Sequence, residues 1–382
     1  MFRKVILSTS LCFALMLTVL FPVKVNALSQ ESITAPSAVL MEASTGKILF
    51  EKNSHEQRPC ASVTKVMTLL LVFEAMDSGR LSLEDTITTS EHAASMGGSD
   101  IWLEPGETMS ADDMIKATVV ASANDAAVAL AEHISGSEDA FGEQMNSRAK
   151  ELKMNDTVFK NCNGLDEEGH VTSANDVAIM SRELMKHEKI FDYTSIWIDN
   201  LRDGKTQIVN TNKLLKTYNG ITGLKTGTTD DAGCCMSASA TRDNVSLVAV
   251  VLGCKTGKER FADAAALLDY GFANVSVKEL SIPDDMPLQI TVNGGMADSV
   301  ELNCNVSSNI VLDKSSNAEV ETEINLPESI DAPITQNQKI GTLIFKVNDK
   351  EVALCDITAK ADVEKTSFTG VLSVLFNSLI AL

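Results

Sequence analysis

A serine and a lysine three residues apart, Ser62 and Lys65, stand at the head of a long apolar run, Val66 to Ala75. Pro59, just before them, favours a loop and opposes helix further back, so we predict a helix that begins close to Ser62. Residues three apart lie on one face of a helix, which brings the Lys65 amine within reach of the Ser62 hydroxyl. Burial and the positive end of the helix would lower the pKa of Lys65. A neutral lysine beside a serine can activate that serine as a nucleophile.

The S-x-x-K spacing alone is weak evidence, because chance supplies a second copy at Ser147 and Lys150. The ordinary interpretation of a single copy is a helix cap followed by a surface lysine. Cys60 is an alternative candidate nucleophile, and His55 is the only histidine near it in the sequence. The assignment of Ser62 therefore depends on further motifs.

Two further motifs follow along the chain in a fixed order. Ser122-Ala123-Asn124 gives S-x-N, and Lys225-Thr226-Gly227 gives K-T-G, followed by Thr228. The order S-x-x-K, S-x-N, K-T-G is typical of penicillin-binding proteins and serine β-lactamases. The chain resembles that superfamily over residues 33 to about 272 and is most similar to the low-molecular-mass D-alanyl-D-alanine carboxypeptidases. The similarity extends to Arg58-Pro59, residues 61–68, residues 122–126, Asn163-Gly164-Leu165, residues 212–215 and residues 223–227.

Both later motifs also have second copies, at residues 173–175 and 255–257. The first opens a predicted helix and is interpreted as an N-cap, and the second leads from a predicted strand into the last helix. We assign the motifs to Ser122 and Lys225, because only Lys225 precedes the predicted strand, turn and strand of residues 234–253. Related enzymes often carry an arginine where this chain has Lys255, so we expect a point charge there in place of a planar guanidinium.

The resemblance implies a catalytic role for three side chains. Ser62 attacks the carbonyl of the penultimate D-alanine, Lys65 takes the hydroxyl proton, and Ser122 relays a proton to the departing D-alanine. The backbone N–H groups of Ser62 and Thr228 form the oxyanion hole.

The resemblance also implies a set of substrate-binding residues. Asn124 hydrogen-bonds the peptide backbone, and Lys225 with the hydroxyl of Thr226 or Thr228 holds the terminal carboxylate. Gly227 completes this K-T-G edge.

The implied activity is a serine-type carboxypeptidase that trims peptidoglycan stem peptides ending in D-Ala-D-Ala from five residues to four. β-Lactams are then covalent inhibitors. No cofactor is implied, and no Cys/His cluster has the spacing of a metal site. A class A β-lactamase needs a glutamate in an E-x-x-L-N stretch, for which the nearest matches are residues 151–155 and 321–325. The three motifs are also compatible with a DD-endopeptidase and with a non-catalytic wall-binding or penicillin-sensing protein.

Hydrophobic periodicity predicts the fold class. Strand patterns at both ends of residues 28–273 surround a helical middle, which indicates an α/β sandwich of the β-lactamase/transpeptidase type with one antiparallel sheet. Alternating patterns in residues 274–362 predict a small all-β domain. Residues 363–382 carry apolar side chains at helical spacing and predict a C-terminal amphipathic helix that anchors the protein to a membrane surface.

Residues 1–27 have the charged start, apolar run and small-residue cleavage site of a secretory signal. We therefore expect an exported protein, peripheral on the outer face of the cell membrane. The formal net charge of −20 argues against nucleic-acid partners. Seven cysteines remain after removal of the signal, and the sequence leaves their disulfide status open.

Overall fold

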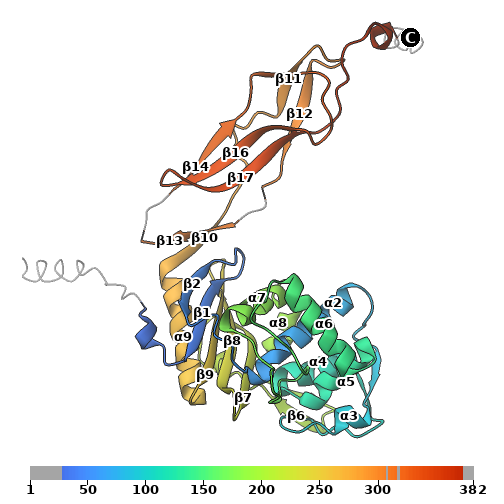
Figure 1. The fold of residues 1–382 in the computed structure, drawn as a ribbon, viewed down its shortest axis with the longest axis vertical. Coiled ribbons are helices and arrows are strands. Elements are labelled where there is room, and N and C mark those ends of the chain that lie inside the picture. Colours follow the sequence, from blue (N-terminus) through green and yellow to red (C-terminus); the bar gives the residue numbers. More distant parts are fainter. Residues whose placement is uncertain (1–27, 307–308, 316–318, 373–382) are drawn as a thin grey trace, which may run out of the picture.

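The computed structural model describes residues 28–306, 309–315 and 319–372. Figure 1 shows a helix-and-sheet part that is followed along the chain by an all-β part. The helices are α2 (Lys65–Asp77), α3 (Glu91–Ala94), α4 (Ala111–Lys116), α5 (Asn124–Ser135), α6 (Glu138–Glu151), α7 (Ala174–Leu184), α8 (Ile190–Thr194) and α9 (Gly257–Asn274). Short 3-10 turns are η2 (Gln30–Ser32), η3 (Ala61–Thr64) and η5 (Lys213–Lys216), and η4 (Ala117–Ala121) is a π-helix.

One five-stranded antiparallel sheet organises the first part. Its order is β2-β1-β9-β8-β7, so strands from the two ends of this part lie side by side, and the predicted sandwich is confirmed (Figure 1). The strands are β1 (Ser37–Glu42), β2 (Ile48–Lys52), β7 (Ile221–Thr229), β8 (Gly233–Arg242) and β9 (Val245–Cys254). Two small two-stranded antiparallel sheets flank the helices, formed by β3 (Thr86–Thr88) with β4 (Thr108–Ser110) and by β5 (Ile198–Leu201) with β6 (Thr206–Val209).

Both faces of this sheet are buried. Alternate residues of β1 show the division: Val39 and Met41 belong to the core shared with the helical middle, whereas Ala38 and Leu40 belong to the core beneath α9. The period of two in a strand sends successive side chains to opposite faces. Helix α2 lies inside the first core, and its residues Lys65 to Phe73 are all buried, as expected for a helix that is apolar on every side.

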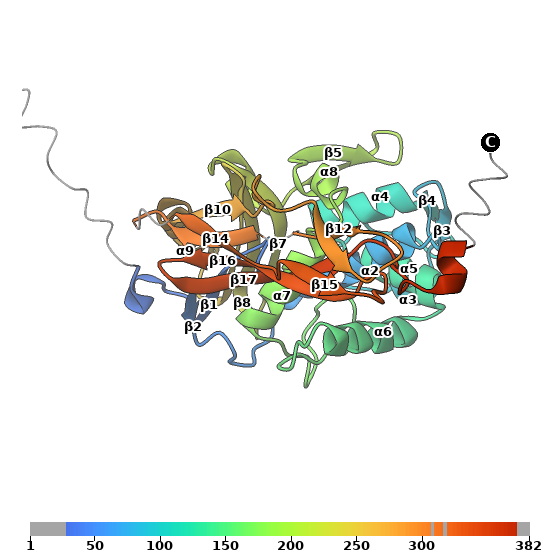
Figure 2. The ribbon, with the colours of Figure 1, turned by 90° about the horizontal axis from the view of Figure 1, so that it is seen from above.

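The second part is an all-β unit with its own core. A six-stranded sheet has the order β14-β16-β17-β12-β11-β15, and β10 pairs with β13 where the chain leaves α9 (Figures 1 and 2). The small all-β domain predicted over residues 274–362 is present, with hairpins that pair β11 with β12 and β16 with β17. The strands are β10 (Val275–Glu279), β11 (Gln289–Asn293), β12 (Ser299–Cys304), β13 (Asn309–Asp313), β14 (Val320–Asn325), β15 (Ser329–Asp331), β16 (Lys339–Val347) and β17 (Lys350–Ala359).

The predicted signal, residues 1–27, lies outside the described residues, as do residues 373–382 of the predicted C-terminal helix. The predicted start of that helix at residue 363 is wrong, because Val363 pairs with Ile334 and is buried in the core of the all-β unit. The helix begins at Phe368, which is 83% exposed, and Leu372 is 55% exposed. Among the helices that the structure describes, none combines the length and the apolar character needed to cross a membrane.

Candidate active site

The candidate nucleophile, Ser62, lies in the 3-10 turn that leads directly into α2. Ala61, just before it, has a positive φ of 50°, a conformation that is uncommon for residues other than glycine and is concentrated at functional sites. The turn packs closely against β7. A Cβ added to Gly227 would stand only 2.8 Å from the Ser62 nitrogen. The K-T-G motif is thus held directly against the turn that carries Ser62.

The Lys65 amine contacts three oxygen atoms. Nζ lies 3.1 Å from Ser62 Oγ, 2.5 Å from Asn124 Oδ1 and 2.7 Å from the Asn163 carbonyl oxygen. Burial lowers the pKa of Lys65 to about 7, because removal from water disfavours the charged amine. A large fraction of Lys65 is therefore neutral near pH 7 and can accept the Ser62 proton.

The S-x-N residues lie where the helical geometry is irregular. Ser122 ends the π-helix η4 in the left-handed conformation, with φ of 62°, and π-bulges are frequent at functional sites. Asn124 then begins α5, and its amide donates to the Gly97 carbonyl at 2.6 Å while its Oδ1 accepts from Lys65. The irregular turn therefore brings both S-x-N side chains to the two lysines of the site.

The K-T-G residues come from the edge strand β7. Lys225 Nζ donates to Ser122 Oγ at 2.7 Å and to the Thr226 carbonyl at 2.9 Å. Burial, together with the nearby cations Lys65 and Arg260, lowers the pKa of Lys225 well below its ordinary value. A bound carboxylate would favour the charged form of Lys225 and pair with Arg260, so this edge suits a substrate carboxylate. Thr226 Oγ1 donates to Thr211 Oγ1 at 2.6 Å.

Arg260, which no motif in the sequence marks, reaches the same edge from α9. Its Nη1 donates to the Gly227 carbonyl at 3.0 Å and to Thr228 Oγ1 at 3.1 Å. The expectation that Lys255 takes the place of an arginine is therefore wrong, because the guanidinium comes from five residues later. In the sequence, the one feature that could have indicated this role is the position of Arg260 near the start of the predicted last helix. The packing of α9 across the sheet is what brings it to β7.

The second copies of the later motifs have capping roles. Ser173 accepts from the Asp176 N–H at the start of α7, and Thr256 forms a capping box with Glu259 at the start of α9. Cys60 is fully buried, and burial raises the pKa of its thiol to about 11. A protonated thiol is a poor nucleophile, so the structure disfavours Cys60 as a rival to Ser62.

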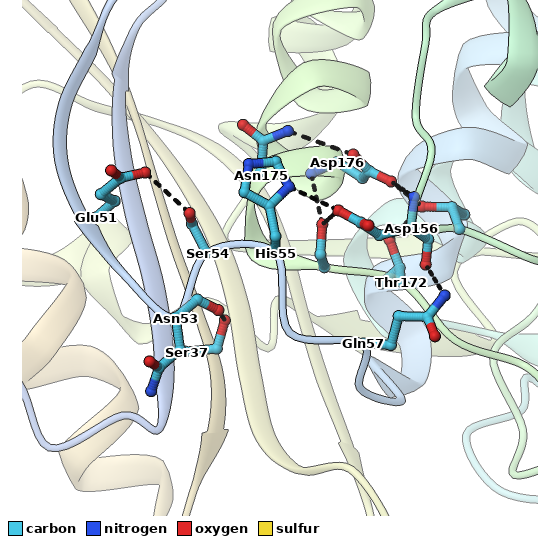
Figure 3. A network of polar contacts seen from close by, with 12 residues as sticks. Ser37, Glu51, Asn53, Ser54, His55, Gln57, Asp156, Thr172, Asn175 and Asp176 are labelled. Carbon is cyan, nitrogen blue, oxygen red and sulfur yellow. Dashed lines mark hydrogen bonds and ion pairs between the residues drawn. The ribbon is translucent and has the colours of Figure 1, made fainter.

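A polar network anchors the chain on the way to Ser62 (Figure 3). His55 Nδ1 lies 2.7 Å from Asp156 Oδ2, and Ser173 Oγ donates to the same oxygen at 3.1 Å. The backbones of Arg58 and Thr172 exchange hydrogen bonds of 2.7 and 2.9 Å. The segment before Ser62 is thus fixed to the loop that precedes α7.

The loop that carries Asn163 is held against α2 by His170, a residue that sequence analysis left without a role. His170 Nδ1 accepts from the Lys160 N–H at 3.1 Å, so Nε2 carries the proton and donates to Thr64 Oγ1 at 2.8 Å. Burial lowers the pKa of His170 to about 4, which keeps the ring neutral. His170 is thereby a positioning residue for the loop whose Asn163 carbonyl receives Lys65.

We predict that His170→Ala lowers kcat for the reaction at Ser62 roughly fivefold, because the Thr64 contact is worth about 1 kcal/mol, and changes KM by less than about threefold. Steady-state kinetics separates the two parameters. His170→Gln keeps a donor and is expected to recover part of kcat, whereas His133→Ala, on the exposed side of α5, should change neither. An equal loss in kcat for the alanine and glutamine variants would contradict the positioning role.

We also predict that Gly227→Ala lowers activity by about two orders of magnitude, because the new methyl group meets backbone atoms of the Ser62 turn and pushes β7 outward. Activity and thermal unfolding should be measured together. The matched control is Gly142→Ala in α6, where a Cβ meets nothing within 4 Å. Wild-type activity in Gly227→Ala would show that the contact between turn and strand is not needed.

Comparisons with known proteins identify the family of the chain. The chain matches the family model Peptidase_S11, D-alanyl-D-alanine carboxypeptidase, over residues 24–256, and the model PBP5_C, penicillin-binding protein 5 C-terminal domain, over residues 278–365. The D-alanyl-D-alanine carboxypeptidase DacF of Bacillus subtilis is 45% identical over 338 residues, 87% of each chain. DacC of Escherichia coli is 31% identical and covers 90% of this chain and 88% of its own.

Solved structures give the same result. Penicillin-binding protein 5 from Haemophilus influenzae has a TM-score of 0.76 and 30% identity, over 89% of this chain and 100% of that chain. Penicillin-binding protein D2 from Listeria monocytogenes, solved in its ampicillin-bound form, has a TM-score of 0.59 and 31% identity, over 64% of this chain and 100% of that chain.

Proposed function

This chain belongs to the D-alanyl-D-alanine carboxypeptidase family, Peptidase_S11, and we propose that Ser62 is the residue through which it acts. A member of this family is a serine hydrolase that removes a terminal D-alanine from peptidoglycan peptides. The observation that carries the assignment is the contact of a buried, largely neutral Lys65 with the Ser62 hydroxyl at 3.1 Å.

Acylation begins when Ser62 Oγ attacks the carbonyl of the penultimate D-alanine. Lys65 Nζ takes the hydroxyl proton, and the negative charge of the tetrahedral intermediate falls on the former carbonyl oxygen. The backbone N–H groups of Ser62 and Thr228 receive that oxygen. The close packing of Gly227 on the Ser62 turn supports this pairing, because it places the K-T-G strand beside the Ser62 amide.

The leaving D-alanine needs a proton on its nitrogen and a partner for its carboxylate. Ser122 Oγ contacts Lys225 at 2.7 Å and relays a proton to the departing amine. The carboxylate binds to Lys225, to the hydroxyl of Thr226 or Thr228, and to Arg260, which already donates to Thr228. Asn124 holds the peptide backbone, and water then hydrolyses the Ser62 ester.

The direct test measures D-alanine release from diacetyl-Lys-D-Ala-D-Ala by the full chain. Release of D-alanine together with mass-spectrometric mapping of a penicilloyl group to Ser62 is the expected result. A protein that binds penicillin but releases no D-alanine would be a non-catalytic penicillin-binding protein.

We predict that hydrolysis of the penicilloyl-enzyme is slow, on a scale of minutes or longer. A class A β-lactamase deacylates through a glutamate placed in the site. The candidate nearest to that motif, Glu151, ends α6, is 62% exposed and pairs with Arg148 at 3.0 Å. Turnover of a chromogenic cephalosporin by the purified protein measures this rate, and rapid turnover would favour a β-lactamase.

We also propose that the protein is exported and rests on the outer face of the cell membrane through residues 368–382. The secretory pattern of residues 1–27 and the apolar spacing of the tail support this placement. The exposed Phe368 and Leu372 at its described start offer apolar contacts to a lipid surface. Fractionation of cells that express the full chain and a chain ending at residue 367, which keeps the contacts of Val363 and Thr366 with the all-β unit, tests it, since only the full chain should sediment with membranes.

A further inference from the structure

Two cysteines oppose each other beside the carboxylate-binding edge. In the register of β8 and β9, Cys234 lies directly opposite Cys254. Both side chains belong to the cluster beneath α9, so they project from the same face of the sheet. Directly opposed residues of antiparallel strands have Cα atoms about 4.5–5.5 Å apart, which lies inside the range of about 4.4–6.8 Å that a disulfide requires.

The pair is connected to the site by a short series of contacts. Thr228 Oγ1 contacts Cys234 Sγ at 3.9 Å, and Arg260 Nη1 donates to the same Thr228 oxygen at 3.1 Å. Cys254 Sγ lies 4.0 Å from Asp263 Oδ2, on the same helix as Arg260. A movement of the Cys234 sulfur therefore acts on the hydroxyl and the guanidinium that meet the substrate carboxylate.

The two thiols differ in access. Cys234 is half-buried and Cys254 is almost wholly buried. The neighbouring Cys235 projects into the core on the other face of the sheet, where its thiol donates to the Ala232 carbonyl at 3.4 Å. All seven cysteines in the part of the chain that the structure describes are free thiols, so the structure shows the reduced form.

We propose that Cys234 and Cys254 form a reversible disulfide with small-molecule disulfides such as oxidised glutathione, and that this bond weakens substrate binding at Thr228. The proposal rests on the carboxypeptidase function proposed above. The Cys234 thiolate attacks one sulfur of the reagent and releases one thiol. Cys254, whose thiol pKa burial raises to about 12, then loses its proton, attacks Cys234 Sγ and releases the second thiol, so we expect this second step to be the slow one and to quicken as the pH rises. Two cysteine thiols are oxidised, one reagent disulfide is reduced, and the two protons leave with the released thiols.

The expected effect on substrate binding follows from the direction in which the Cys234–Cys254 disulfide would pull the Cys234 sulfur. A disulfide draws the Cys234 sulfur towards β9 and away from Thr228 Oγ1, so Thr228 and its partner Arg260 lose a neighbour that fixes them. Loss of one weak hydrogen bond corresponds to a change of about two- to tenfold. We therefore expect KM for a D-Ala-D-Ala peptide to rise about two- to tenfold in the oxidised enzyme.

Peptide mapping tests the bond. The full chain is treated with oxidised glutathione, blocked with N-ethylmaleimide and digested with trypsin, which leaves Cys234 and Cys235 on residues 226–242 and Cys254 on residues 243–255. We expect these two peptides to be linked in the wild type and in Cys235→Ser, and separate in Cys234→Ser and Cys254→Ser. The absence of the link in the wild type, or its persistence in Cys234→Ser, would overturn the proposal.

Kinetics tests the coupling to the site. Reduced and oxidised wild type are compared with Cys234→Ser, which lacks the thiol that reacts first and should show the same KM before and after oxidation, and with Cys355→Ser in β17, which should still respond. Linked peptides with an unchanged KM would refute the coupling to Thr228. If the reduced wild type releases no D-alanine, the carboxypeptidase assignment fails separately, and the mapping alone still decides whether the disulfide forms.

Discussion

Alanine in place of Ser62 is expected to abolish covalent labelling by penicillin and to lower D-alanine release by at least about 10⁴-fold. Removal of the nucleophile eliminates the acyl-enzyme, and losses of this size or more follow when a catalytic serine is removed from a unit that acts together. Mass spectrometry of the labelled protein and an assay of released D-alanine measure the two effects.

The chain offers a matched control for this substitution. Ser147 and Lys150 repeat the S-x-x-K spacing on α6, and both side chains are exposed. Ser147→Ala is expected to retain wild-type labelling and activity. The Ser62 variant should also unfold at nearly the wild-type temperature, because a small hydroxyl is lost from a partly exposed position. A Ser62→Ala protein that still becomes acylated would refute the assignment.

Arginine in place of Lys65 is expected to lower the acylation rate by about 10²- to 10⁴-fold, the range that general-base catalysis contributes. Arginine keeps a positive charge and hydrogen-bond donors but does not lose its proton in proteins. The substitution therefore distinguishes a base from an electrostatic partner. Lys150→Arg in the exposed copy is the control. Retention of more than about a tenth of the acylation rate by Lys65→Arg would contradict the role of Lys65 as base.

The pH dependence of the wild type provides an independent test of Lys65. Burial places its pKa at about 7, and the neutral amine is the active form. The acylation rate should therefore fall about tenfold per pH unit below pH 7 and level off above it. Stopped-flow acylation by a penicillin across pH 5 to 9 gives this profile. A flat profile over that range would show that another group accepts the Ser62 proton.

Local patterns in the sequence were sufficient where the structure depends on neighbouring residues. The hairpin of β1 and β2, the alternation of β11 and β12, and the N-cap at Ser173 follow from turn residues, strand period and side-chain capping over a few positions. The spacing of Ser62 and Lys65 likewise predicted their contact. The structure contains each of these features.

Contacts between residues far apart in the sequence could not be predicted from such local patterns. Arg260 lies 32 positions from Thr228 and His170 lies 106 positions from Thr64, and no local period relates either pair. The opposition of Cys234 and Cys254 depends on the register of two strands and on the face from which each side chain projects. The low pKa of Lys65 is a quantitative result of complete burial, which depends on everything packed around α2.

The amino-acid sequence by itself determined the order of the three motifs, the alternation of helix and strand, and the identity of the candidate nucleophile and base. The tertiary structure alone decided how closely β7 packs against the Ser62 turn, which cation joins Lys225 at the edge of β7, and how far burial shifts the pKa values of the two lysines. The physical reason is that spacing and periodicity act along the chain, whereas desolvation and close packing act between surfaces that meet only after folding.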